Sequence, residues 1–125
     1  MTRPLPALGA QELAIMKVVW RLKDASVRDV YETLRERRPV AYTTVMTMMK
    51  VLEDKGFVQK TMVERAHVYR PAKPRQQVVG AMVRDFVDRV FDGASASLLL
   101  HLAKDARMTD RQRKAVQRII KEMDE

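Results

Sequence analysis

A short segment near the middle of the chain carries small polar and basic side chains at helical spacing. Four of these residues recur at steps of three and four positions: Thr43, Met46, Thr47 and Lys50. Side chains at this spacing lie on one face of a helix. Threonine hydroxyls can bond phosphates or base edges, threonine and methionine methyl groups can contact the thymine methyl, and Lys50 can pair with a phosphate or a guanine. This face therefore has the chemistry to contact double-stranded nucleic acid.

The start of the same segment offers further candidate contacts. Unpaired backbone amides at a helix N-terminus favour a phosphate, and Tyr42, Thr43 and Thr44 stand at that end. Each residue also has a structural alternative: the two threonines can cap the helix, Tyr42 can pack beneath the preceding turn, and Met46 can be an ordinary helix former. We keep these four residues as candidate DNA contacts beside those alternatives.

The candidate face belongs to the last of three predicted helices. Apolar residues at helical spacing and the usual start and stop signals place these helices at residues 8–22, 26–38 and 42–55. Ser26 with Asp29 fits a capping box, and Gly56 supplies a C-terminal stop. In the third helix the buried stripe is expected to comprise Val45, Met48, Met49 and Leu52. That stripe leaves the polar face free to enter a major groove.

Two β-prone runs follow the third helix, at residues 57–62 and 66–70, and predict a hairpin. Lys60, Arg65 and His67 lie on it or at its tip. They can touch phosphates or the minor groove, although ordinary surface charges would have the same pattern. Three helices followed by a hairpin are the order of a winged helix, so residues 1–73 are predicted to form a winged helix-turn-helix DNA-binding domain.

Residues 74–125 are predicted to be helical throughout. One helix ends near Asp92-Gly93, a second covers residues 95–104, and a third follows a capping box of Thr109 and Gln112. So short a segment cannot bury its apolar faces within one chain, so we expect it to pack against a second copy. The expected dimer contacts are Val79, Met82, Val83, Phe86, Val90, Leu99, Leu102, Val116, Ile119 and Ile120. The predicted fold is thus mainly α with a small hairpin.

Charge and composition narrow the classes of function. The 125 residues carry a net charge of +8, and residues 1–73 alone hold 14 Lys and Arg against 8 Asp and Glu, a net +6. Such a surface attracts polyanions, which supports nucleic acid as the partner. There are no cysteines and only two histidines, so no metal and no cofactor is expected. No secretory signal or membrane span is recognisable, which predicts a cytoplasmic protein without membrane insertion.

Several stretches together resemble the penicillinase-repressor (BlaI/MecI) family of winged-helix regulators. They are residues 8–20, 26–30, 41–47, 52–58 and 97–104, so the resemblance covers nearly the whole chain. It implies a homodimeric repressor on an inverted-repeat operator, often with TACA/TGTA half-sites. It further implies that the third helix lies in the major groove and that the C-terminal helices interlock.

The resemblance also implies a membrane sensor protease as a partner. In antibiotic-responsive members this partner triggers cleavage at an Asn-Phe junction, and the corresponding pair here is His101-Leu102. Because the pair differs, the expectation of cleavage does not carry over, and Leu102 is expected to be a buried helix residue. The inducing signal stays open.

Two other classes of function compete with the repressor. A winged helix can be a protein-interaction adaptor, although the basic first segment and the small-residue face count against that. A sequence-independent nucleic-acid binder would need only the charge. An enzyme is not expected, since there is no phosphate loop and no nucleophile with a base at workable spacing.

Overall fold

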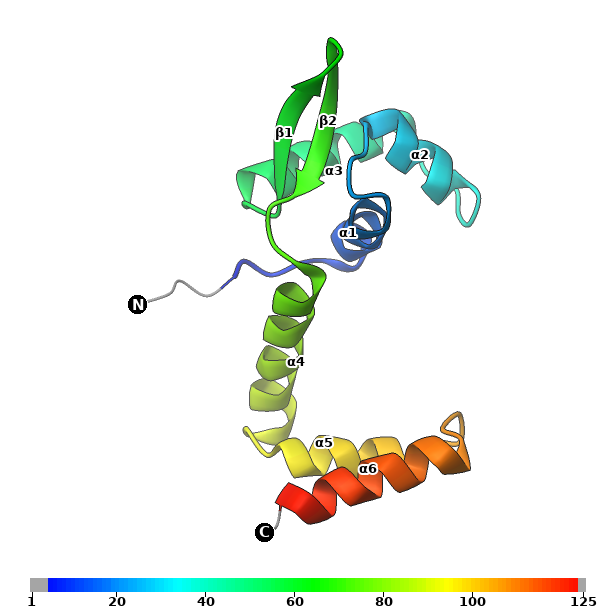
Figure 1. Cartoon of the computed structure of the whole chain (residues 1–125), viewed down its shortest axis with the longest axis vertical. Coiled ribbons are helices and arrows are strands. Elements are labelled where there is room, and N and C mark those ends of the chain that lie inside the picture. The colour runs from blue at the N-terminus through cyan, green and yellow to red at the C-terminus, as the bar shows by residue number, and fades with distance from the viewer. Residues whose placement is uncertain (1–4, 124–125) are drawn as a thin grey trace. The chain divides into compact units, whose positions relative to one another are not determined.

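The structure, a computed structural model, describes residues 5–123 and confirms the mainly helical fold with one antiparallel hairpin (Figure 1). In chain order the elements are α1 (Ala10–Leu22), α2 (Val27–Arg35), α3 (Tyr42–Asp54), β1 (Val58–Val63), β2 (Ala66–Pro71), α4 (Arg75–Phe91), α5 (Ser95–Ala103) and α6 (Asp110–Met123). The second helix ends earlier than expected, at Arg35. The chain forms two compact units that meet between Val79 and Gly80, inside α4.

The helix ends follow the local signals in the sequence. The Ser26 hydroxyl accepts a hydrogen bond of 3.0 Å from the Asp29 amide, and the Asp29 carboxylate accepts one of 2.9 Å from the Ser26 amide. Thr109 and Gln112 make the same reciprocal pair at the start of α6. Gly56 ends α3 with φ of 84°, a left-handed conformation that favours glycine.

The N-terminal unit has a closed apolar core between its three helices and the base of the hairpin. Its fully buried side chains include Ile15, Met16, Val19, Val30, Val45, Met49, Leu52, Phe57 and Val58. Burying each such side chain stabilises the fold by roughly 1.5–3 kcal/mol. The core fixes which face of α3 is turned outward.

A nearly buried ion pair joins the start of α1 to the end of α3. Lys55 Nζ lies 2.8 Å from one Glu12 carboxylate oxygen and 3.0 Å from the other, and it also donates to the Ala7 carbonyl. The Gly9 amide donates to the same carboxylate at 3.0 Å. Burial opposes ionisation of Glu12, but the hydrogen bonds from Lys55 and Gly9 outweigh it and lower the pKa of Glu12. The pair therefore anchors α3 through an ionised carboxylate.

The hairpin pairs its strands in a regular register, from Val58 opposite Pro71 to Val63 opposite Ala66. Glu64 and Arg65 form the two-residue turn with φ of 50° and 70°. Positive φ at both central positions is the pattern of a type I′ turn, which matches the twist of a hairpin. The connection between α1 and α2 also pairs with the hairpin, because Ala25 forms an antiparallel bridge with Tyr69 of β2.

The first turn of α4 belongs to the N-terminal unit. Val78 is 1% exposed, and the Trp20 indole nitrogen donates to the Lys73 carbonyl at 3.1 Å just before the helix. Trp20 is half-buried, so its ring packs while its polar nitrogen is paired.

The C-terminal unit has almost no core of its own. Helices α5 and α6 lie side by side (Figure 1), but neither contains a buried residue within the described range. In this unit, among the residues described, Val87 alone is a buried apolar side chain, at 6% exposure. The Phe91 ring contacts Phe86 and His101, with ring centroids 5.9 and 5.3 Å apart.

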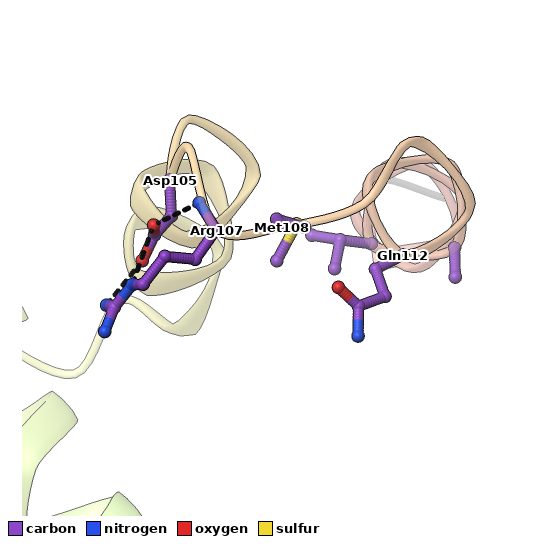
Figure 2. Close-up of a pocket in the computed structure, with 6 residues that line it drawn as sticks. Asp105, Arg107, Met108 and Gln112 are labelled. Carbon is purple, nitrogen blue, oxygen red and sulfur yellow. Dashed lines mark hydrogen bonds and ion pairs between the residues drawn. The ribbon is translucent and has the colours of Figure 1, made fainter.

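The turn between α5 and α6 is held by arginine side chains. The Arg113 guanidinium donates to the carbonyls of Ala103, Asp105 and Met108, and Arg107 pairs with the Asp105 carboxylate at 2.8 Å (Figure 2). The hydrogen bonds from Arg107 lower the pKa of Asp105 to about 2. Beside this turn lies an open hollow lined by Asp105, Arg107, Met108, Gln112, Ala115 and Val116. Its charged groups are already paired with each other.

Candidate nucleic-acid interface

Helix α3 turns the predicted polar face outward. Val45, Met49 and Leu52 are fully buried and Met48 is half-buried, as expected for the inner stripe. The four residues on the opposite face, Thr43, Met46, Thr47 and Lys50, are all exposed. Met46 is 49% exposed, so its side chain is accessible to a partner. An apolar side chain held in water on a polar face is suited to contact a thymine methyl.

The start of α3 leaves its backbone amides accessible to a ligand. The N-cap is Ala41, which has no side chain able to accept a hydrogen bond, and Thr43 and Thr44 lie inside the first turn. Neither threonine therefore occupies the capping position that was their alternative role. Thr44 is half-buried, whereas Thr43 is exposed.

An aromatic and basic cluster adjoins this helix start. Tyr42 is 39% exposed, and its ring meets Tyr31 of α2 edge-on with centroids 5.5 Å apart. The Arg28 guanidinium lies 5.9 Å from the centre of the Tyr42 ring, and the Arg28 side chain is 72% exposed. Tyr42 thus packs against α2 and still presents an accessible edge beside a cation.

Two carboxylates of α3 lie close to the Lys50 ammonium group. Its Nζ lies 3.4 Å from Asp54 Oδ1 and 3.6 Å from Glu53 Oε1. The charge of Asp54, its hydrogen bond and the charge of Glu53 raise the pKa of Lys50. The only cation of α3 is therefore already paired with carboxylates of the same helix.

The hairpin gathers two of its three candidate residues on one face. The pairs Lys60–Tyr69 and Met62–His67 share a face because strand residues alternate sides with period two. Lys60 and His67 are exposed there, with Met62 between them at 54% exposure. Arg65 is exposed in the turn itself. The strand β1 packs against α3, so the hairpin and the outward face of α3 belong to one unit.

Two residues of this surface were missed in the sequence. Arg28 lies in the first turn of α2, and only the packing of α2 against α3 places it beside Tyr42. Met62 alternates with Thr61 and Val63, so strand periodicity alone could have placed it beside His67.

The residues expected at a dimer contact are apolar and largely exposed in the single chain, Val79 at the end of the N-terminal unit and the others in the C-terminal unit. Exposed in the single chain are Val79, Val83, Phe86, Val90, Leu102 and Ile119, and half-buried are Met82, Leu99, Val116 and Ile120. Leu102 was expected to be buried, but it is 39% exposed in one chain. Leu100 and Met123, each 49% exposed, extend the same apolar character.

The chain matches the penicillinase repressor family over residues 8–122. It belongs to the penicillinase-repressor family. The relatives of this family member include the transcriptional regulator BlaI of Mycobacterium tuberculosis, 36% identical over 80% of this chain and 74% of that protein. The penicillinase repressor of Bacillus licheniformis is 22% identical over 96% of this chain and 94% of the relative.

A solved structure of a relative supports the fold of this penicillinase-repressor family member. It is the solution structure of the Bacillus licheniformis BlaI monomeric form in complex with the blaP half-operator. The TM-score is 0.52 at 26% identity, and the match covers 58% of this chain and 88% of the other. The winged-helix prediction is therefore confirmed. No helix within residues 5–123 is both long and apolar enough to cross a membrane.

Proposed function

We propose that this protein is a transcriptional repressor that binds an inverted-repeat operator as a homodimer. The observation that carries the proposal is the outward face of α3, where threonine, methionine and lysine side chains stand exposed above a buried inner stripe. The fold agrees with that of a relative, the Bacillus licheniformis BlaI monomeric form, whose structure was solved in complex with a half-operator. Membership of a family of repressors also favours a regulator over an enzyme.

The proposed contacts divide between base edges and the phosphate backbone. Thr43, Met46, Thr47 and Lys50 would meet base edges in the major groove. Tyr42, Thr44 and Arg28 surround the open amides of the α3 start and would hold a phosphate there. Lys60, Arg65 and His67 on the hairpin would contact the neighbouring backbone or minor groove.

The dimer is inferred from the missing core of the C-terminal unit. Apolar side chains such as Val83, Phe86 and Ile119 are 41–47% exposed in one chain. Large apolar side chains gathered in one unit without a core of their own are typical of an interaction site. A second copy would cover it and place two recognition helices about one DNA turn apart, roughly 34 Å.

The family resemblance implies that a membrane sensor protease takes part in relieving repression. His101 and Leu102 lie inside α5, so cleavage between them would require that helix to open. We propose that a membrane sensor protease, if it acts on this repressor, cuts elsewhere. A repressor must reach its operator DNA, so the cytoplasm is the location that we propose.

The test is selection of binding sites from random duplexes at several salt concentrations. An inverted repeat that keeps its preference at physiological salt would support the dimeric repressor. A steep salt dependence without an enriched sequence would support the sequence-independent binder, and no binding would support the protein adaptor.

The recognition face is tested on the selected operator. Thr44→Ala and Lys50→Ala should weaken operator binding by roughly 5- to 100-fold, as expected when one good contact is lost, and should leave the dimer intact. Lys114→Ala, an exposed helical lysine of the C-terminal unit, is the matched control. Unchanged binding of Lys50→Ala would show that this residue of the outward face does not read the operator, and unchanged binding of Thr44→Ala would show that Thr44 does not help to hold a phosphate.

A further inference from the structure

Helix α3 is negatively charged although the unit that carries it is strongly positive. Between Tyr42 and Asp54 the helix contains one cation, Lys50, and two anions, Glu53 and Asp54, a net charge of −1. Residues 1–73 as a whole have a net charge of +6. The attraction for a polyanion therefore comes from other elements, and the helix proposed to enter the groove does not add to it.

The three charges form a compact group at the C-terminal end of the reading face. Lys50 Nζ lies 3.4 Å from Asp54 and 3.6 Å from Glu53, with the Lys50 side chain 64% exposed and that of Asp54 65% exposed. Glu53 is less accessible, at 26% exposure. Burial raises the pKa of Tyr69 in β2, the charge of Glu53 raises it further, and that of Lys50 opposes the rise. The group thus sits where α3 meets the hairpin.

We infer that Glu53 and Asp54 are specificity-determining residues that withhold Lys50 from phosphates on non-operator DNA. The inference rests on the proposed function. A lysine that reaches a phosphate must leave its carboxylates, and both carboxylates would then face the phosphate unpaired. A guanine edge offers two aligned acceptors and lies in the groove, farther from the phosphates. Lys50 therefore changes partner at the operator and stays paired elsewhere.

The physical consequence concerns non-specific binding. Contacts to phosphates supply essentially all of non-specific affinity, and their number sets its salt dependence. With Lys50 paired, its ammonium group contributes no such contact to random sequence. The ratio of operator affinity to random-duplex affinity rises, because Lys50 adds to the affinity for the operator and not to the affinity for random duplex.

The experiment compares the full-length wild type with Glu53→Gln/Asp54→Asn. Binding is measured on the selected operator and on a random duplex of equal length, between about 50 and 200 mM salt. We expect the variant to bind random duplex about tenfold more tightly, with the salt slope steeper by about one per protomer, while operator affinity rises less than about threefold. Equal gains on both duplexes would overturn the inference.

A matched control and a Lys50→Gln background distinguish an effect that depends on Lys50 from a general effect of lost negative charge. Glu36→Gln/Glu122→Gln removes two exposed carboxylates elsewhere and should change both affinities equally and less. Lys50→Gln should lower operator affinity yet leave random-duplex affinity and its salt slope unchanged. Adding Glu53→Gln/Asp54→Asn to Lys50→Gln should leave the salt slope on random duplex the same as that of Lys50→Gln alone. A triple variant with a slope as steep as that of Glu53→Gln/Asp54→Asn would refute the role of Lys50.

Failure of this inference is distinguishable from failure of the proposed function. If the wild type selects no sequence, the repressor proposal fails and there is no specificity for these residues to determine. If the wild type selects an operator and the double variant keeps the same ratio of affinities, only the role of Glu53 and Asp54 is refuted.

Discussion

The two units of the chain use apolar residues in opposite ways. In the N-terminal unit Ile15, Met49 and Phe57 are fully buried, whereas in the C-terminal unit Phe86, Leu100 and Ile119 are 41–49% exposed. Both units contain amphipathic helices with similar periodicity in sequence. The difference is that the first closes its apolar faces on each other and on the hairpin, while the second leaves them open.

This contrast implies a division of labour. A closed core lets the N-terminal unit hold α3 in one orientation, which a reading surface requires. An open apolar surface on the C-terminal unit makes its stability depend on a partner, so folding and association there are expected to be coupled. The predictions below test each side of this contrast.

The largest effect is expected when a charged side chain is introduced among the exposed apolar residues of the C-terminal unit. Val83→Asp places a carboxylate at a position that is 46% exposed in one chain and would be buried in the dimer. We expect the dimer to dissociate and affinity for a two-half-site operator to fall by roughly 10²-fold or more, since the half-sites are no longer bound by a linked pair. Sedimentation and operator binding measure the two effects.

The control for that change is Asp88→Ala, an exposed polar position of the same helix, which should keep the dimer. Phe86→Asp should act like Val83→Asp. A dimer that survives both charged variants would exclude this face of α4 from the interface.

The next effect concerns the closed core. Phe57→Ala removes a fully buried ring and should lower the free energy of unfolding by about 3–5 kcal/mol at every protein concentration. Ile119→Ala, 47% exposed in one chain, should destabilise only at concentrations where the dimer forms. Denaturant unfolding at two concentrations checks both. A Phe57→Ala loss that varied with concentration would contradict an independent N-terminal unit.

A smaller effect is expected at the ion pair between α1 and α3. Glu12→Gln should lower the free energy of unfolding by roughly 1–3 kcal/mol near neutral pH, because Lys55 loses its charged partner. Since folding lowers the pKa of Glu12 from 4.5, its contribution is full above about that pH and is lost as the pH falls through the folded value.

The measurement is urea unfolding of the wild type and Glu12→Gln as a function of pH. The difference between them should shrink below pH 4.5, the ordinary pKa of a glutamate side chain. Glu36→Gln, an exposed position, should show no comparable difference. A gap that widened on acidification would mean that the carboxyl is protonated in the fold.

The smallest effect is expected at the tip of the hairpin. Arg65 has φ of 70°, and a left-handed conformation costs a residue with a side chain about 1–2 kcal/mol. Because glycine loses more chain entropy, Arg65→Gly should raise the free energy of unfolding by no more than about 1 kcal/mol. Thermal unfolding measures this. Arg65→Ala removes the same charge without relieving the backbone, so it should gain no stability, and both should weaken DNA binding alike.

Much of the local architecture followed from the sequence. The capping residues Ser26 and Thr109 and the stop at Gly56 are local signals, and the structure shows each in its expected role. The inner stripe of α3 followed from the positions of Val45, Met49 and Leu52. Such features depend on neighbours within about four residues, which a linear pattern contains.

Other features required the folded chain. The Ala25–Tyr69 bridge and the Glu12–Lys55 pair join residues far apart in sequence. Val78 is buried whereas the adjacent Val79 is exposed. The type I′ geometry of Glu64-Arg65 was also absent from the pattern, because neither residue belongs to the usual turn formers.

The sequence by itself determined the order of the elements, the polar face of α3 and the family resemblance. Only the tertiary structure decided which segments cover the apolar sides of the first unit, where three helices and the base of the hairpin close on one another. The physical reason is that periodicity records which side of a helix is apolar, whereas burial depends on what other segment, or what other chain, covers that side.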